Sequence, residues 1–194
     1  MNTRGHTFFI EDGIETHNII EENLGLGTRP TFSLLNSDTT PATFWITNPN
    51  NIIRNNRAAG GDRYGFWFDI PLNPTGSSRT SSVCGRGEKL GVFEGNTAHS
   101  YGRYGLRIFR GHIPRERPCD DVKDDNLDDP WSYNPSIPAE YKDFTAFKNG
   151  RSGAVGEDVG DIRFIDFKVA DHVLAGINMT FNEFSRPYES TTYQ

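Results

Sequence analysis

The sequence predicts an all-β protein, and within that class a parallel β-helix solenoid with long inserted loops. Helical periodicity is nearly absent, because apolar residues seldom recur three or four positions apart and Gly, Asn and Pro interrupt every long window. Short alternating runs that are typical of strands occur instead. An internal repeat at offsets of 33 and 40 residues then favours a solenoid over other all-β folds.

The repeat is clearest in two pairs of segments. Residues 51–56 match residues 18–23, and residues 56–68 match residues 96–108 with Asn, Ala, Arg, Tyr and Gly conserved between the copies. Such a repeat predicts coils whose equivalent residues stack about 4.8 Å apart. An antiparallel sandwich is the rival fold, since it also uses short strands and turns. We prefer the β-helix because a sandwich gives no reason for the repeat.

Local patterns place the individual elements. Alternation predicts strands at residues 44–46, 65–70, 105–109, 162–169 and 176–181. Residues 71–90, rich in Pro, Gly and Ser, and residues 111–140, which include an acidic stretch, are predicted to be inserted loops. The residues expected to point into the coils are Ile20, Ile53 and Phe93 on one side, and Phe66, Phe68, Leu106, Ile108, Ile177 and Met179 on another.

Asparagines recur where the coils should turn. Asn23, Asn56 and Asn96 are separated by the repeat offsets, and Asn149 is a further candidate. Asn tolerates left-handed backbone geometry better than other non-glycine residues, and its amide can extend a hydrogen-bonded ladder along a stack. We therefore predict an asparagine ladder in which these residues occupy the left-handed corner positions.

Length and charge limit the classes of protein. A chain of 194 residues supports one core, so residues 5–185 are expected to form a single domain followed by a polar tail at 186–194. No apolar run is long enough for a membrane-spanning helix. The net charge of −6 argues against a nucleic-acid partner. The polar start shows no signal peptide, which suits either an intracellular protein or a piece of a longer chain.

Few residues are candidates for covalent or metal chemistry. Cys84 and Cys119 are compatible with a disulfide, as in a secreted protein, or with two unpaired thiols. The five histidines have no ligand-like spacing, so we expect no metal site and no cofactor. Asn178 begins a glycosylation sequon, Asn-Met-Thr, on a predicted strand.

Several segments resemble a known module. They are Thr43 to Asn51, Tyr64 to Phe68, the opening residues 5–15, and residues 93–100. These strings resemble the right-handed β-helix region of CEMIP-type hyaluronan-binding and hyaluronan-degrading proteins and of the fibrocystin-L group of large receptors. The resemblance covers residues 5–109. It implies a right-handed, extracellular β-helix within a longer chain, usually preceded by a G8 domain, and it transfers no catalytic residue to this sequence.

The repeat also predicts a candidate binding face. Arg63 and Arg103 should lie on adjacent coils, where like charges repel unless Asp62, another nearby carboxylate or an anionic ligand offsets them. Alternation turns Trp67 and Arg107 outward as a cation–π pair that also suits a sugar ring. A structural ladder covered by a loop is the alternative interpretation. The candidate ligand-binding residues are Arg63, Tyr64, Trp67, Arg103, Tyr104 and Arg107.

These features predict a non-catalytic extracellular module of a secreted or cell-surface protein. Its expected ligand is an acidic polysaccharide such as hyaluronan, and its neighbours are the upstream and downstream domains of the same parent protein. One alternative is part of a hyaluronan-degrading glycosidase, which needs two carboxylates about 5–9.5 Å apart. The available acids are Asp62, Asp69, Glu94 and Asp161. A second alternative is a structural spacer in a receptor ectodomain.

Overall fold

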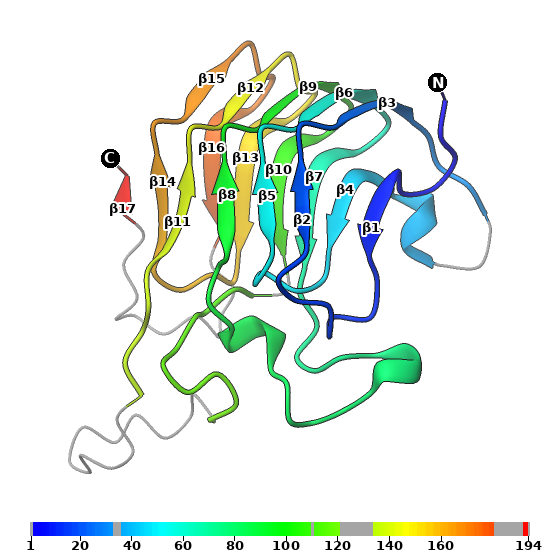
Figure 1. Ribbon diagram of the computed structural model, residues 1–194. Helices are drawn as coiled ribbons and strands as arrows, with labels where there is room; N and C mark the ends of the chain where they lie inside the picture. Colours follow the sequence, from blue (N-terminus) through cyan, green and yellow to red (C-terminus); the bar gives the residue numbers. More distant parts are fainter. Residues whose placement is uncertain (1, 33–35, 110, 121–133, 181–191, 194) are drawn as a thin grey trace.

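A computed structural model describes residues 2–32, 36–109, 111–120, 134–180 and 192–193. The protein is a parallel β-helix in which three parallel sheets run along the same axis (Figure 1). Within the described residues, five coils each contribute one strand to every sheet, and a sixth coil begins. The fold class predicted from the sequence is therefore confirmed.

Each sheet collects one strand from each successive coil. Sheet 1 contains β1 (Phe8–Ile10), β4 (Ala42–Ile46), β7 (Tyr64–Asp69), β10 (Tyr104–Phe109), β13 (Ser152–Glu157) and β16 (Ala175–Thr180). Sheet 2 contains β2 (Ile19–Glu21), β5 (Ile52–Arg54), β8 (Val92–Glu94), β11 (Ala139–Lys142), β14 (Ile162–Ile165) and β17 (Thr192–Tyr193). Sheet 3 contains β3 (Leu24–Thr28), β6 (Arg57–Gly61), β9 (Thr97–Tyr101), β12 (Thr145–Phe147) and β15 (Lys168–Ala170).

The only helical elements among the described residues are three short 3-10 turns. They are η1 (Asn36–Thr39), η2 (Gly76–Ser78) and η3 (Gly85–Gly87). None of the described helices is long and apolar enough to cross a membrane. The structure thus relies on pairing between coils.

The strand register confirms both offsets of the repeat. Ile53 pairs with Ile20 at the offset of 33, and Tyr104 pairs with Tyr64 at the offset of 40. The prediction of one strand over residues 162–169 was wrong, because the chain turns at Asp166, which has a positive φ of 55°. A strand crossing a corner has to break there, and this corner separates β14 from β15.

Aromatic side chains fill the interior of the coils. Phe44 stacks between Phe8 and Phe66, with ring centroids 4.8 and 4.6 Å apart. Phe93 reaches the same core from sheet 2 and meets Phe66 edge to face. The predicted inward residues are confirmed: Ile53, Phe66, Phe68, Phe93, Leu106 and Ile108 are buried in the core, and Ile20, Ile177 and Met179 pack against it.

The predicted asparagine ladder is present at the corner between sheets 2 and 3. Asn56 Oδ1 accepts hydrogen bonds from the backbone N–H and the side-chain amide of Asn23, at 3.0 and 3.1 Å. Asn96 Oδ1 accepts the corresponding bonds from Asn56 at 3.0 and 3.2 Å. Asn149 is not part of this ladder, because it lies at a different corner and accepts a bond from the Tyr101 N–H.

The predicted backbone geometry of the ladder residues was wrong. The left-handed residues are Glu22, Asn55 and Gly95, one position before each ladder asparagine. The ladder side chains must point into the stack to bond one another, so the preceding residue takes the strained turn. In the fourth coil Phe144 follows the left-handed Asp143 and replaces the amide with an apolar side chain.

The ladder predicts a large cost for removing its central member. Asn56→Ala deletes the side-chain bonds to Asn23 and Asn96 and leaves the carbonyl of Ile20 without its amide donor. We expect the free energy of unfolding to fall by about 2–4 kcal/mol in urea denaturation. The matched control is Asn55→Gly, which places at that corner the residue that Gly95 already provides in the next coil. A control loss as large as that of Asn56→Ala would contradict the prediction.

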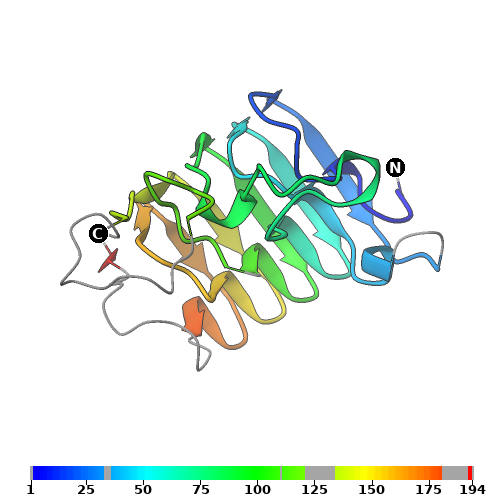
Figure 2. The same cartoon turned by 90° about the horizontal axis from the view of Figure 1, so that it is seen from below.

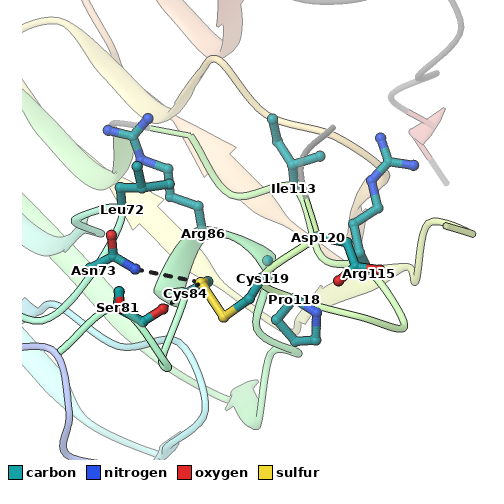
Figure 3. Close-up of a pocket in the computed structure, with 11 residues that line it drawn as sticks. Leu72, Asn73, Ser81, Cys84, Arg86, Ile113, Arg115, Pro118, Cys119 and Asp120 are labelled. Atoms are coloured by element: carbon teal, nitrogen blue, oxygen red, sulfur yellow. Dashed lines mark hydrogen bonds between the residues drawn. A yellow bond between two sulfur atoms is a disulfide. The ribbon is translucent and has the colours of Figure 1, made fainter. Parts of the chain in front are cut away.

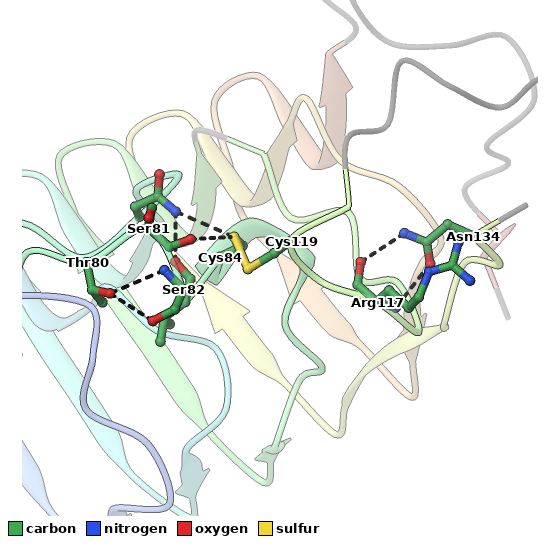
Figure 4. Close-up of a disulfide and its surroundings, with 9 residues drawn as sticks. Thr80, Ser81, Ser82, Cys84, Arg117, Cys119 and Asn134 are labelled. Atoms are coloured by element: carbon green, nitrogen blue, oxygen red, sulfur yellow. Dashed lines mark hydrogen bonds between the residues drawn. A yellow bond between two sulfur atoms is a disulfide. The ribbon is translucent and has the colours of Figure 1, made fainter. Parts of the chain in front are cut away.

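The described parts of the two predicted loops, residues 71–90 and 111–120, lie on the same side of the stack, after the carboxyl ends of β7 and β10 (Figure 1); Figure 2 views the stack from that side. A disulfide between Cys84 and Cys119 joins them, with Cα atoms 5.0 Å apart (Figure 4). Of the two alternatives that the sequence leaves open for these cysteines, the structure contains the disulfide and not two unpaired thiols. Residues 121–133, including most of the acidic stretch, lie outside the described residues.

Removal of the disulfide should destabilise the protein. The two cysteines are 35 residues apart, and a cross-link over that distance lowers the entropy of the unfolded chain by an amount worth about 3–4 kcal/mol. We expect Cys84→Ser with Cys119→Ser to reduce the free energy of unfolding by up to this amount under non-reducing conditions. The wild type in reductant should show the same loss, and an unchanged denaturation midpoint would refute the prediction.

Candidate functional site

A row of three arginines follows the corner between sheets 3 and 1. The Arg103 N–H donates to the Arg63 carbonyl at 3.1 Å, and the Arg151 N–H donates to the Arg103 carbonyl at 2.9 Å. The residues therefore occupy one position on three successive coils, and we call them the arginine row. The structure places Arg63 and Arg103 side by side, as the repeat predicts.

Arg151 was missed by the sequence analysis. The signal that would have found it is the string Gly-Arg-x-Gly, which occurs at Gly102 to Gly105 and again at Gly150 to Gly153. The long loop between these strings stretches the offset beyond the two that the repeat shows.

The arginine row carries little compensating charge. Arg63 Nε pairs with Asp62 Oδ2 at 2.8 Å, which confirms Asp62 as the expected partner. Within the described part of the chain, no carboxylate forms an ion pair with Arg103 or Arg151. Arg151 is exposed, and the other two are half-buried. Three arginines at one backbone position, with one ion-paired acid among the described residues, bring net positive charge to this corner of a protein of net charge −6.

Glycines keep the corner beside this row narrow. A Cβ at Gly102 would collide with the carbonyl oxygen of Asp62, and one at Gly150 would collide with that of Gly102. The coils consequently approach closely here and leave a cleft of about 350 Å³. Its lining is Gly27, Thr28, Arg29, Gly60, Gly61, Asp62 and Gly102. Asp62 and Gly102 are the sequence neighbours of the first two arginines, so the cleft adjoins the row.

The rest of the predicted binding face forms a packed cluster on the outer face of sheet 1. Arg107 lies over the rings of Phe109 and Trp67, with its guanidinium carbon 4.0 and 5.3 Å from the centroids. It also donates to the Tyr64 hydroxyl at 3.0 Å and pairs with Glu157 at 2.9 Å. The predicted cation–π pair of Trp67 and Arg107 is therefore present.

This cluster leaves no open aromatic platform at Trp67. The side chain faces outward, but the residue is only 5% exposed because Trp45, Tyr64 and Arg107 surround it. The stacking role that the sequence suggests for Trp67 is therefore not supported. Tyr104 stacks on Tyr64 at 5.8 Å and remains half-buried, so it is the tyrosine that borders the surface.

A buried histidine extends the same face to the first coil. The His6 ring stacks on Trp45 with centroids 4.3 Å apart, and its Nδ1 accepts a hydrogen bond from the Ala42 N–H. Burial lowers the pKa of His6 to about 4, against a smaller opposing effect of Asp38. His6 is therefore neutral at physiological pH and contributes no positive charge to the face.

A second cleft lies between the two long loops (Figure 3). It measures about 420 Å³, and the Cys84–Cys119 disulfide forms part of its wall. The Ile113 N–H donates to the Arg86 carbonyl at 2.8 Å, so the two loops are paired as well as cross-linked. The disulfide and this hydrogen bond hold the two loops together around the cleft.

His112 anchors these loops to the core. Its Nε2 donates to the Glu88 carbonyl at 3.0 Å, so its Nδ1 accepts from the Tyr141 hydroxyl at 3.1 Å. Burial lowers the pKa of His112 to about 4 and raises the pKa of Tyr141. Neither group has the exposure that proton transfer to a bound substrate would require.

Three of the four acids that the sequence suggests for glycoside hydrolysis form ion pairs or hydrogen bonds with other side chains. Asp62 pairs with Arg63, while Asp69 is buried and accepts from the Trp45 indole at 3.3 Å. Asp161 pairs with Arg163 at 3.2 Å.

Glu94 lies in a groove of about 400 Å³ with Glu140 and Lys142. Hydrogen bonding from Lys142 lowers the pKa of Glu140, whereas a general acid needs a raised pKa. The shift at Glu140 is therefore opposite to the one that a general acid needs.

Comparison with known proteins places this chain in a family. Residues 1–106 match the family model described as the CEMIP β-helix. The chain belongs to the CEMIP β-helix family. The family resemblance that the sequence suggests is confirmed.

Several larger proteins contain a similar domain. The chain is 38% identical to fibrocystin-L of Mus musculus over 174 residues, covering 90% of this chain and 4% of that protein. It is 35% identical to the cell surface hyaluronidase CEMIP2 of Homo sapiens, covering 93% and 15%. It is 32% identical to the cell migration-inducing and hyaluronan-binding protein of Mus musculus, covering 92% and 15%. The chain spans a small fraction of each relative.

The two buried histidines predict a pH dependence of stability. Their folded-state pKa values of about 4 lie below that of free imidazole, so the unfolded chain binds more protons between pH 6.5 and 4. The contribution of the two histidines to stability is therefore complete above pH 6.5 and is lost as the pH falls through this window, by up to about 7 kcal/mol in total. Urea denaturation at stepped pH should show the loss, and His112→Gln should reduce it. A pH-independent unfolding free energy would contradict the assignment.

Proposed function

We propose that this CEMIP β-helix domain is a non-catalytic extracellular module that binds a linear anionic polysaccharide of the hyaluronan type along the arginine row. The observation that carries the proposal is the alignment of Arg63, Arg103 and Arg151 on successive coils, where Asp62 is the one acid among the described residues that forms an ion pair with them. Stacked like charges destabilise the coils, and a bound polyanion relieves that repulsion. Guanidinium groups also suit bidentate binding of carboxylates.

The relatives support the same class of ligand and location. One is named as a cell surface hyaluronidase and another as a hyaluronan-binding protein. Because this chain covers 4–15% of the relatives, we propose that the module acts within a longer secreted or cell-surface parent protein, beside upstream and downstream domains. Asn178 continues the row of Trp67, Arg107 and Val155 on sheet 1, so a glycan at Asn178 would hinder the binding of a long polymer and would count against this proposal.

Titration with hyaluronan oligosaccharides tests the proposal. We expect the triple variant Arg63→Ala, Arg103→Ala, Arg151→Ala to bind about ten- to a hundredfold more weakly, because three charge contacts of about 0.5–1 kcal/mol each are lost. The affinity of the wild type should fall steeply with salt. Calorimetry at two salt concentrations measures both effects.

Arg54→Ala is the matched control. Arg54 is also an exposed arginine paired with one acid, Glu21, but it lies on sheet 2. It should retain wild-type affinity. Absence of binding at millimolar sugar, or equal loss in the control, would refute the arginine row as the site and favour a structural spacer. Shortening of the oligosaccharides by the purified domain would instead favour a glycosidase.

A further inference from the structure

The two cysteines of the disulfide differ in their access to solvent. Cys119 is exposed, whereas Cys84 is buried at 7% exposure. Both line the cleft of about 420 Å³ between the two long loops (Figure 3). Thiol–disulfide exchange begins with the attack of a thiolate on one sulfur, and access decides which sulfur is attacked. A small thiol that enters this cleft therefore meets Cys119 before Cys84.

Hydrogen-bonding groups beside Cys84 suit it to leave as a thiolate. Asn73 Nδ2 donates to Cys84 Sγ at 3.4 Å and to the Val83 carbonyl at 2.9 Å, so both of its amide hydrogens have acceptors. A donor beside a sulfur stabilises the thiolate, and exchange is faster when the leaving thiolate is the more stable one. After protonation the released thiol also has an acceptor, because the Ser81 carbonyl oxygen lies 3.8 Å from Cys84 Sγ.

The charge of the cleft defines the class of thiol that fits it. Arg86 and Arg115 line the cleft, and the one acid among its described lining residues, Asp120, forms an ion pair with Arg117. A cleft with net positive charge raises the local concentration of small anions. A small thiol that carries carboxylates is therefore favoured over a neutral one.

The position of the disulfide allows the cleft to open while the stack stays intact. Neither cysteine belongs to a strand of the three sheets. Closer to the stack, the loops are also paired through two backbone hydrogen bonds, from the Ile113 N–H to the Arg86 carbonyl and from the Arg115 N–H to the Gly87 carbonyl, at 2.8 and 2.9 Å. Cleavage of the disulfide therefore releases residues 116–120 from the first loop and leaves this pairing and the coils in place.

We propose that the Cys84–Cys119 disulfide is a thiol-exchange site for a small anionic thiol of the glutathione class, and that its cleavage opens the cleft between the loops. The thiolate attacks Cys119 Sγ and forms a mixed disulfide with it. The electron pair of the old S–S bond leaves with Cys84 Sγ, which Asn73 stabilises, and Cys84 then takes up the proton that the small thiol gave up. A second thiolate that attacks the small-thiol sulfur of the mixed disulfide reduces Cys119, so two small thiols are oxidised to their disulfide while the protein gains two electrons and two protons.

Mapping of the mixed disulfide tests which sulfur is attacked. The whole chain, folded and oxidised, is incubated briefly with reduced glutathione, trapped with N-ethylmaleimide and analysed by peptide mass spectrometry. Glutathione should be found on Cys119 and the maleimide on Cys84. Glutathione on Cys84, equal amounts on both cysteines, or no reaction of the folded chain would contradict the inference.

The leaving-group role of Asn73 has a test of its own. Asn73→Ala should slow the reaction with glutathione about two- to tenfold, because one hydrogen bond to the leaving sulfur is lost. A merely structural role predicts the opposite sign, since a looser loop exposes the disulfide and speeds its reduction. Thr80→Ala is the matched control, because Thr80 bonds Ser82 in the same loop (Figure 4). An unchanged or faster rate for Asn73→Ala, or an equal decrease in the control, would refute the assignment.

Hydrogen–deuterium exchange separates opening of the cleft from unfolding. In the reduced chain, amides within residues 71–90 and 111–120 should exchange several-fold faster than in the oxidised chain, while those of β4 and β7 should keep their protection. The double variant Cys84→Ala, Cys119→Ala should show the same pattern without any thiol. Faster exchange throughout the strands, or unchanged exchange in both loops, would overturn the inference.

Discussion

The structure depends on parallel pairing of each coil with the coils before and after it. Each of the first five coils supplies three strands of only three to six residues, and such strands are not stable in isolation. They persist because equivalent residues lie above one another along three sheets. The Asn23–Asn56–Asn96 ladder reinforces this pairing at one corner, since each amide bonds both the backbone and the side chain of its neighbour. A corner that drifted by one residue would lose all of these bonds.

The same stacking explains why a surface feature in this protein forms a line. A residue type that recurs at one position of successive coils forms a row, in which neighbouring members are about 4.8 Å apart. Asparagines and phenylalanines in such rows stabilise the stack, whereas arginines repel one another. Among the described residues, Asp62 is the one acid that forms an ion pair with the arginine row of Arg63, Arg103 and Arg151. A linear polyanion has the geometry to contact all three members at once.

Side chains on the outer face of sheet 1 differ in exposure for the same reason. Trp67 has neighbouring strands on both sides, and Trp45 and Arg107 pack against it from the adjacent coils. Phe9, which is 54% exposed, lies on the first strand of the sheet, where only one neighbour is present among the described residues. Outward orientation therefore does not by itself produce an accessible ring. The accessible aromatic surface is at the first coil, and the accessible positive charge is at the corner.

The sequence alone was sufficient to predict the fold class, the strand register at both offsets, the inward residues and the stacking of Arg63 on Arg103. All of these follow from a repeat in the order of residues, because a solenoid converts sequence offsets directly into contacts. The sequence analysis missed Arg151 because a long loop makes its distance from Arg103 in the sequence larger than the two offsets of the repeat. The left-handed corner residues, the cross-linked loops, the burial of Trp67 and the unequal exposure of the two cysteines required the tertiary structure. They depend on which side chains from neighbouring coils and loops occupy the surrounding space, and no periodicity in one dimension records that packing.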